Sequence, residues 1–139
     1  MHDHQPFSPE RTWADKFRNA FHGLRLGVRG QRSFLVHAAF ALAVVACAAA
    51  FRVSLGEWCL LAIAIAMVLA AEMFNSALEF LAKAITREHD YHLGSALDIG
   101  SAAVLIAAVG AAAVGLMIFL NRLGLALGWW PWQAPAAPS

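Results

Sequence analysis

Residues 99 to 120 read IGSAAVLIAAVGAAAVGLMIFL, a stretch without a single charged side chain. A helix of about 20 residues, rising about 1.5 Å per residue, is long enough to cross a hydrocarbon core about 30 Å thick. The stretch therefore predicts a transmembrane helix. Two more apolar runs precede it, over residues 33–51 and 58–81, and only His37 interrupts the first near its start. We predict an all-α integral membrane protein with three transmembrane helices, and helices of a soluble core are the disfavoured alternative.

The composition supports the membrane prediction. Of the 139 residues, 60% are hydrophobic and 14% are charged, whereas soluble domains carry about 25% charged residues. The net charge of +1 gives no strong field, so nucleic acid is not an expected partner. Cys47 and Cys59 both lie inside apolar runs and are interpreted as small buried residues, not as a disulfide or a metal pair.

Residues 11–32 precede the first span and combine an apolar face with positive charge. Trp13, Phe17 and Phe21 recur at helical spacing, and six basic residues lie among them. This pattern predicts an amphipathic surface helix in the plane of the membrane interface. A soluble amphipathic helix packed on the spans is the alternative, and both descriptions can hold. Residues 1–10 are expected to be disordered, and a Trp- and Pro-rich tail is expected over residues 121–139.

The distribution of basic residues predicts the orientation in the membrane. Six precede the first span, and Lys83 and Arg87 lie between the second and third. The other connections carry only Arg52 and Arg122. The positive-inside rule then places the N-terminus and the second connection in the cytoplasm, and the C-terminal tail on the outer side, of a multi-pass protein. Four tryptophans would then lie toward the outer interface: Trp58, Trp129, Trp130 and Trp132.

Polar residues interrupt the second apolar run in a regular pattern. Glu72, Asn75 and Glu79 are spaced i, i+3 and i+7, and Lys83 follows at i+11, so all four share one helical face. If the helix begins at Trp58, Glu72 is buried about two turns short of the cytoplasmic edge and Glu79 lies close to that edge. An ionised carboxylate in hydrocarbon costs at least about 2.5 kcal/mol, so such residues predict a functional site.

The chemistry of these side chains suggests separate roles. A buried carboxylate such as that of Glu72 suits a general base that accepts a proton near neutral pH. Glu79, nearer to water and phosphates, suits a magnesium ligand, because Mg²⁺ prefers a few carboxylate oxygens together with phosphate and water. The alternative is structural. Glu79 would pair with Lys83 at i+4, and Glu72 and Asn75 would hydrogen-bond neighbouring helices.

The connection between the second and third runs, residues 86–98, reads TREHDYHLGSALD. Gly94 and Ser95 are compatible with a turn. Asp98 would stand at the start of the third span, where it is either a helix N-cap or a site residue at the depth of Glu79. The two histidines of this connection lack an obvious third ligand, so a zinc site is disfavoured.

The stretch EMFNSALE at residues 72–79, followed by LDIGSAAVLIAA at 97–108, resembles the prokaryotic diacylglycerol kinase family, which includes the undecaprenol kinases. The family signature is Glu, two residues, Asn, Ser or Thr, a small residue, an aliphatic residue and Glu. The segment AFHGLR, residues 20–25, also looks like the Gly-Leu-Arg stretch of the family. The resemblance covers residues from about 13 to 120, and it implies a kinase-like transmembrane domain over 33–120.

The resemblance implies a membrane lipid kinase that uses ATP and Mg²⁺ to phosphorylate a lipid hydroxyl. It also implies a homotrimer with active sites shared between subunits at the cytoplasmic interface. Carried over to this chain, Glu72 is expected to be the general base, Asn75 a hydrogen-bonding residue of the site and Glu79 a metal ligand. Gly94 and Asp98 fall in the segment expected to bind the nucleotide.

Four positions depart from the family pattern. Leu97 stands where the family has a lysine that contacts the ATP phosphates. Near the first span the family has a metal-binding glutamate, and its nearest equivalent here is Gln31, which could offer the metal an oxygen but no charge. Lys83 replaces an aspartate, and Phe74 replaces an aliphatic residue. We hypothesise that Lys83 takes over part of the phosphate contact that Leu97 cannot make.

The resemblance implies phosphorylation of diacylglycerol to phosphatidic acid, and the GSAAVLIAA stretch favours that branch of the family. Two alternatives stay open: undecaprenol as the lipid substrate, or a lipid-binding member whose catalysis is impaired because of Gln31 and Leu97. A small transporter or channel is disfavoured, because the third span offers no ionisable residue inside the bilayer.

Overall fold

The structure is a computed structural model that describes residues 12–29, 32–86, 88 and 90–129. Within these residues all regular elements are helices, which confirms the predicted all-α class. In chain order the helices are α1 (Trp13–Val28), α2 (Arg32–Ala50), α3 (Leu55–Ile85) and α4 (Tyr91–Ala126). The predicted surface helix over residues 11–32 therefore corresponds to a shorter helix, α1, and the tail beyond residue 129 lies outside the described residues.

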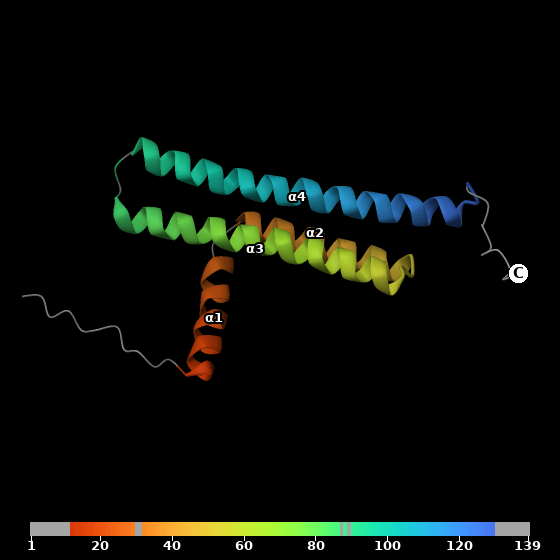
Figure 1. The fold of residues 1–139 in the computed structure, drawn as a ribbon, viewed down its shortest axis with the longest axis horizontal. Coiled ribbons are helices and arrows are strands. Elements are labelled where there is room, and N and C mark those ends of the chain that lie inside the picture. Colours follow the sequence, from red (N-terminus) through yellow and green to blue (C-terminus); the bar gives the residue numbers. More distant parts are fainter. Residues whose placement is uncertain (1–11, 30–31, 87, 89, 130–139) are drawn as a thin grey trace, which may run out of the picture.

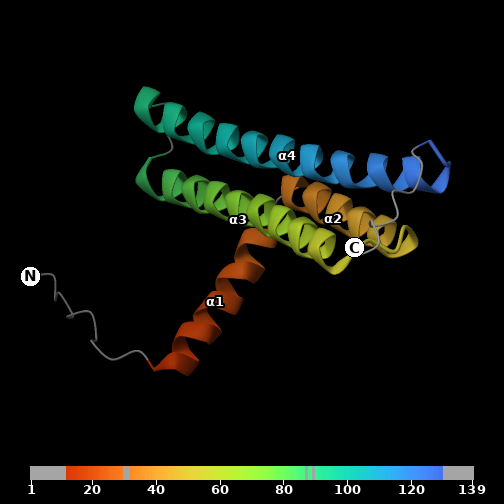
Figure 2. The same cartoon turned by 45° about the vertical axis from the view of Figure 1, so that its right-hand side comes forward.

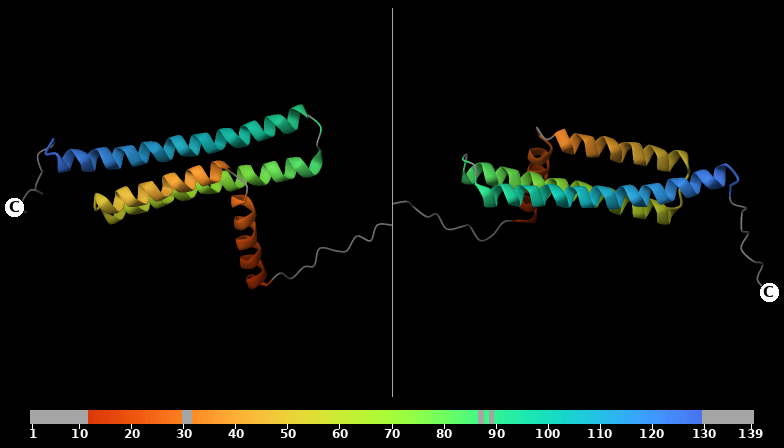
Figure 3. Two further views of the ribbon diagram at one scale, coloured as in Figure 1. Left: turned by 180° about the vertical axis from the view of Figure 1, so that it is seen from behind. Right: turned by 90° about the horizontal axis from the view of Figure 1, so that it is seen from above.

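Three of these helices, α2, α3 and α4, are long and apolar enough to cross a membrane. They run side by side, whereas α1 leaves the middle of the bundle across their direction (Figure 1). Helices α3 and α4 form an antiparallel hairpin, and α2 runs beside the half of α3 that is farther from the α3–α4 turn (Figures 2 and 3). The predicted arrangement, a shorter amphipathic helix followed by three helices of spanning length, is confirmed.

The spanning helices differ in length. Helix α2 has 19 residues, and at 1.5 Å per residue its length of about 28 Å matches a hydrocarbon core of about 30 Å. Helices α3 and α4 have 31 and 36 residues, about 46 Å and 54 Å. The α3–α4 hairpin therefore continues well beyond the first turn of α2 and beyond the C-terminal end of α1 (Figure 1).

The ends of α3 and α4 are fixed by polar caps. The Ser54 side chain accepts from the backbone N–H of Glu57, whose carboxylate accepts in return from the Ser54 N–H, and so α3 begins three residues before Trp58. Helix α4 begins after Asp90, whose side chain caps it. The expectation that Asp98 is the N-cap was wrong, because Asp90 supplies the cap eight residues earlier.

The expected turn at Gly94 and Ser95 was also wrong, since both lie in the first turns of α4. The Ser95 hydroxyl donates to the carbonyl of Tyr91 at 2.8 Å, within the helix. Glycine is tolerated in a helix at a cost of about 1 kcal/mol relative to alanine. The N-terminal cap and the continuous apolar pattern downstream outweigh that cost, so the chain stays helical through Gly94.

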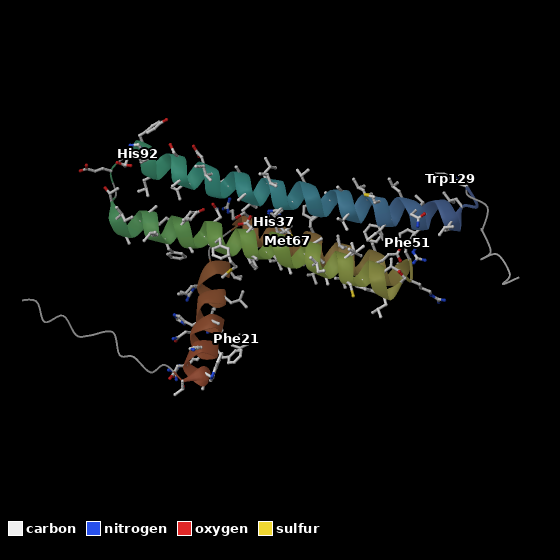
Figure 4. The ribbon with its side chains drawn as sticks, viewed as in Figure 1. Phe21, His37, Phe51, Met67, His92 and Trp129 are labelled. Atoms are coloured by element: carbon white, nitrogen blue, oxygen red, sulfur yellow. The ribbon has the colours of Figure 1, made fainter. Side chains whose placement is uncertain are left out.

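A small apolar core lies at the end of the bundle opposite to the α3–α4 turn. Ala48 and Leu61 are its most deeply buried members, and Val53 and Ile118 complete it. The rings of Phe51 and Phe119 pack beside it, with centroids 6.0 Å apart. Trp58 also packs on this core, and the exposed Trp129 lies at the same end (Figure 4). Trp130 and Trp132 lie outside the described residues.

Much of the apolar surface of α2 and α4 is exposed. Phe40 is 67% exposed, and Ile106 and Met117 are more than 70% exposed. Cys47 and Cys59, expected to be buried, are exposed as well, because they lie on helix faces without a neighbouring helix. Apolar faces of this extent suit contact with lipid or with other protein chains, not with water.

Helix α1 leaves its large apolar side chains exposed. A reciprocal capping box between Thr12 and Asp15 begins it, and the apolar side chains of Trp13, Phe17 and Phe21 are all more than 60% exposed. Its last turn docks against α3. A Cβ atom at Gly27 would lie 2.6 Å from the side-chain sulfur of Met73, so glycine permits this close approach.

Candidate functional site

Glu72 is the only acidic side chain among the described residues that is buried, with 2% of the residue exposed. Two residues of α2 contact its carboxylate. His37 Nε2 lies 3.1 Å from Oε1, and the Ser33 hydroxyl donates to Oε2 at 3.2 Å. His37 lies where α2 passes the middle of α3 (Figure 4). The structural alternative, a hydrogen bond from a neighbouring helix, is therefore realised at Glu72.

These contacts place Glu72 beside the first turn of α2. Ser33, the second residue of α2, donates to its carboxylate. Glu79, about 10 Å farther along α3 at 1.5 Å per residue, lies in the part of the hairpin beyond the start of α2. The depth of Glu72 in the bilayer, two turns short of the cytoplasmic edge, stays a prediction.

The other members of the stripe form a chain of contacts along α3. Asn75 Nδ2 donates to Glu79 Oε1 at 3.4 Å, and Lys83 Nζ lies 3.6 Å from Glu79 Oε2. The i, i+3, i+7, i+11 pattern thus produces a continuous polar face, as its spacing predicts. About a third of the Glu79 side chain is exposed, in contrast to Glu72.

Asn75 carries an unsatisfied polar atom. Its Oδ1 is buried and lacks a hydrogen-bond partner among the described residues. On the facing helix α4, Gly100 brings the backbone close, and a Cβ atom there would lie 2.7 Å from this oxygen. Leaving a buried acceptor unpaired costs about 1–3 kcal/mol. An atom of this kind beside a carboxylate stripe is therefore a candidate ligand-binding atom.

A cavity of about 600 Å³ lies between the end of α3 and the beginning of α4. Lys83 contributes to one wall, and Gly94 and Leu97 contribute to the other. Asp98 does not line this cavity and is exposed on α4. The structure thus brings Lys83, Gly94 and Leu97 together, and leaves Asp98 apart from them.

Sequence reasoning missed Ser33 and His37. Both are polar residues in the first turns of an otherwise apolar helix, and that was the available signal. Their partner could not be identified, because nothing in the linear pattern says which face of α3 they meet. Gln31, expected as a second metal ligand, lies outside the described residues. Within the described part of the chain there is no group of three or more His, Cys, Asp or Glu side chains that could hold a metal ion.

The fold and this stripe define a helical membrane protein with a carboxylate site beside the first turn of its first spanning helix. The family model of prokaryotic diacylglycerol kinase matches residues 18–119. A relative, the undecaprenol kinase of Bacillus subtilis (strain 168), is 34% identical over 107 residues, which cover 77% of this chain and 87% of the relative. No solved structure matches the chain. The chain belongs to the prokaryotic diacylglycerol kinase family, as the resemblance predicted.

Membership of this family indicates a lipid kinase, a transferase of a bacterial membrane. The matched region begins inside α1 and ends inside α4, so it contains the whole carboxylate stripe and the cavity. The buried Glu72 and the polar face of α3 are therefore part of the region that defines the family.

Proposed function

We propose that this protein transfers the γ-phosphoryl group of ATP to the hydroxyl of a membrane lipid, with Glu72 as the general base. The observation that supports this most strongly is the buried Glu72 carboxylate, level with the first turn of α2. A lipid headgroup reaches this level from the bilayer side. A nucleotide reaches it from the side of the projecting hairpin.

The reaction needs one proton transfer and one phosphoryl transfer. Glu72 takes the proton of the lipid hydroxyl as the lipid oxygen attacks the γ-phosphorus. The bond to the bridging oxygen breaks, and ADP leaves. Phosphoryl transfer depends mainly on positioning and on neutralising charge. The protein therefore has to supply a fixed base and a polar environment for the phosphates, which the α3 stripe offers.

Glu79 and Asn75 are suitable to help hold Mg²⁺ that arrives with ATP. Mg²⁺ in nucleotide sites takes one or two carboxylates, with phosphate and water as its other ligands. Glu79 supplies a carboxylate that is about one third exposed, and the unsatisfied Oδ1 of Asn75 is a second oxygen nearby. Gln31 is the proposed third, uncharged ligand. When bound, the ion neutralises phosphate charge. Asn75 then orients Glu79 through their hydrogen bond.

The cavity between α3 and α4 is the proposed nucleotide site. Lys83 supplies a positive charge on its wall, opposite to Leu97. Gly94 leaves open space at its position, since nothing lies within 4 Å of where a Cβ atom would be. A cationic side chain attracts the phosphate groups, and a small residue leaves room for them. Asp98 belongs to the proposed nucleotide segment through the resemblance, although it lies outside this cavity.

The lipid alcohol is diacylglycerol, after the description of the family, or undecaprenol, after the name of the relative. We further propose a homotrimer in the inner membrane, with the N-terminus in the cytoplasm and the C-terminus in the periplasm. The exposed apolar faces of α2 and α4 are compatible with contacts between subunits. The basic residues of α1 support the orientation.

The test measures transfer of labelled phosphate from ATP, with Mg²⁺, to diacylglycerol and to undecaprenol in mixed micelles. We expect the wild type to transfer phosphate to one of the two lipids, which identifies the substrate. We expect Glu72→Gln to abolish this transfer. Retained transfer in Glu72→Gln would remove the general-base role. The absence of transfer to both lipids by inserted wild-type protein would instead favour a lipid-binding family member with impaired catalysis.

A further inference from the structure

We propose that His37 is the positioning residue that fixes the Glu72 carboxylate for proton transfer. This inference rests on the function proposed above. It assigns a role in α2 to a polar residue that lies outside the α3 stripe. The role follows from the contact of 3.1 Å between His37 Nε2 and Glu72 Oε1.

The contact joins a ring nitrogen, which can donate, to a carboxylate oxygen, which accepts. Its length of 3.1 Å lies within the range of N–H···O hydrogen bonds. The pair lies in a protected place, because 22% of the His37 side chain and 3% of the Glu72 side chain are exposed. A hydrogen bond to a carboxylate in such surroundings is stronger than the same bond in water.

Two side chains of one helix contact the two oxygens of the carboxylate, which restrains both its position and its rotation. His37 contacts Oε1, and the Ser33 hydroxyl contacts Oε2 at 3.2 Å. Ser33 and His37 are spaced i, i+4, so both project from the same face of α2. A carboxylate accepts about four hydrogen bonds in total. Acceptor positions therefore remain for the hydroxyl of the lipid.

The next polar residues of the α3 stripe contact one another. Asn75 donates to Glu79, and Glu79 pairs with Lys83. On the side of α1, Gly27 lies against Met73 of α3, an apolar side chain that cannot donate to a carboxylate. Because a base displaced by about 1 Å can cost about 100-fold in rate, the anchoring of Glu72 by α2 should appear in kcat.

Three substitutions separate positioning from general packing. His37→Gln keeps a side-chain N–H that can reach Glu72. His37→Asn carries the same amide on a side chain one methylene shorter, so its N–H falls short. His37→Leu removes the donor and keeps an apolar volume. His22→Leu, on an exposed position of α1, is the matched control. All are purified as full chains and assayed with the lipid that the wild type phosphorylates.

We expect His37→Asn and His37→Leu to lower kcat by about 10- to 100-fold, with the KM for ATP unchanged. We expect His37→Gln and His22→Leu to stay within about threefold of the wild type. A kcat of His37→Asn equal to that of His37→Gln would overturn the proposal, since reach would then not matter. A rise in the KM for ATP with kcat unchanged would overturn it too.

A second readout does not depend on turnover. Dicyclohexylcarbodiimide labels carboxyl groups in apolar surroundings, and mass spectrometry can measure its attachment to Glu72, with Glu79 as internal reference. We expect labelling of Glu72 to be several-fold faster in His37→Asn and His37→Leu than in the wild type or His37→Gln. If the wild type transfers no phosphate, the proposed function fails, and labelling alone decides whether His37 holds Glu72. Equal labelling in all four proteins would contradict the contact.

Discussion

Gly100 of α4 faces Asn75 of α3 so closely that a Cβ atom at position 100 would lie 2.7 Å from Asn75 Oδ1 and 2.9 Å from Leu78 Cδ1. Real Cβ atoms essentially never approach other atoms this closely. The position of the Asn75 amide, and with it the hydrogen bond to Glu79, therefore depends on the absence of a side chain on the facing helix.

The first prediction concerns this contact. Gly100→Ala should displace the Asn75 amide and reduce phosphate transfer by about 10- to 100-fold, because a displacement of about 1 Å in a site has that effect. Gly110→Ala is the matched control on the same helix, since nothing lies within 4 Å of its Cβ position. Transfer assays on both variants, with insertion checked by size-exclusion chromatography, give the answer. Equal activities would show that Asn75 adjusts without consequence.

The second prediction concerns the charge on the cavity wall. Lys83→Ala should raise the KM for ATP by about tenfold and change kcat little, as expected for loss of a charged contact worth about 1.4 kcal/mol. Leu97→Lys, in the Lys83→Ala background, should restore the KM, because both positions line the same cavity. If Lys83→Ala leaves the KM for ATP unchanged, the hypothesis that Lys83 takes over part of the phosphate contact is wrong.

The third prediction separates the two aspartates near the start of α4. Asp90 caps the helix by accepting from the backbone N–H of Leu93 at 2.8 Å, so Asp90→Ala should lower stability by about 1 kcal/mol. Asp98 lies two turns farther along and caps nothing, so Asp98→Ala should leave stability unchanged. Thermal unfolding in detergent measures both. Asp98→Ala should still lower activity if Asp98 belongs to the nucleotide segment, and unaltered transfer would remove it from the proposed site.

The fourth prediction concerns an ion pair at the opposite end of the bundle. Arg122 Nε lies 3.1 Å from both carboxylate oxygens of Glu57, and Arg122 Nη2 also contacts Oε2. Glu57 and Arg122 lie 65 positions apart in the sequence, so no spacing within one helix pairs them. Since hydrogen bonds to charged groups contribute about 1.5–3 kcal/mol, Glu57→Gln should lower the free energy of unfolding by about that amount.

Arg122→Gln should have a similar effect, and the double variant should lose less than the sum of the two, because the same interaction is removed only once. Equilibrium unfolding of the three variants and the wild type completes the cycle. Strict additivity would mean that the two side chains do not interact in the membrane. Phosphate transfer should be little affected, since the pair lies at the end of the bundle opposite to the α3–α4 turn.

The sequence alone was sufficient for the number of spans and for the polar face of α3. Apolar length determines whether a helix can cross a bilayer, and the 3.6-residue period determines which side chains share a face. Both are local properties. Glu72, Asn75, Glu79 and Lys83 could therefore be grouped before the structure was known.

Only the tertiary structure decided which residues of α2 and α4 contact the polar face of α3, and where along α3 they do so. The level of Glu72 relative to the first turn of α2 depends on how the helices are placed against one another. The contacts of His37 and Ser33 with Glu72, and of Gly100 with Asn75, join residues 25 to 39 positions apart in the sequence. Helix packing fixes such pairs, and no periodic pattern within one helix contains the information that selects them.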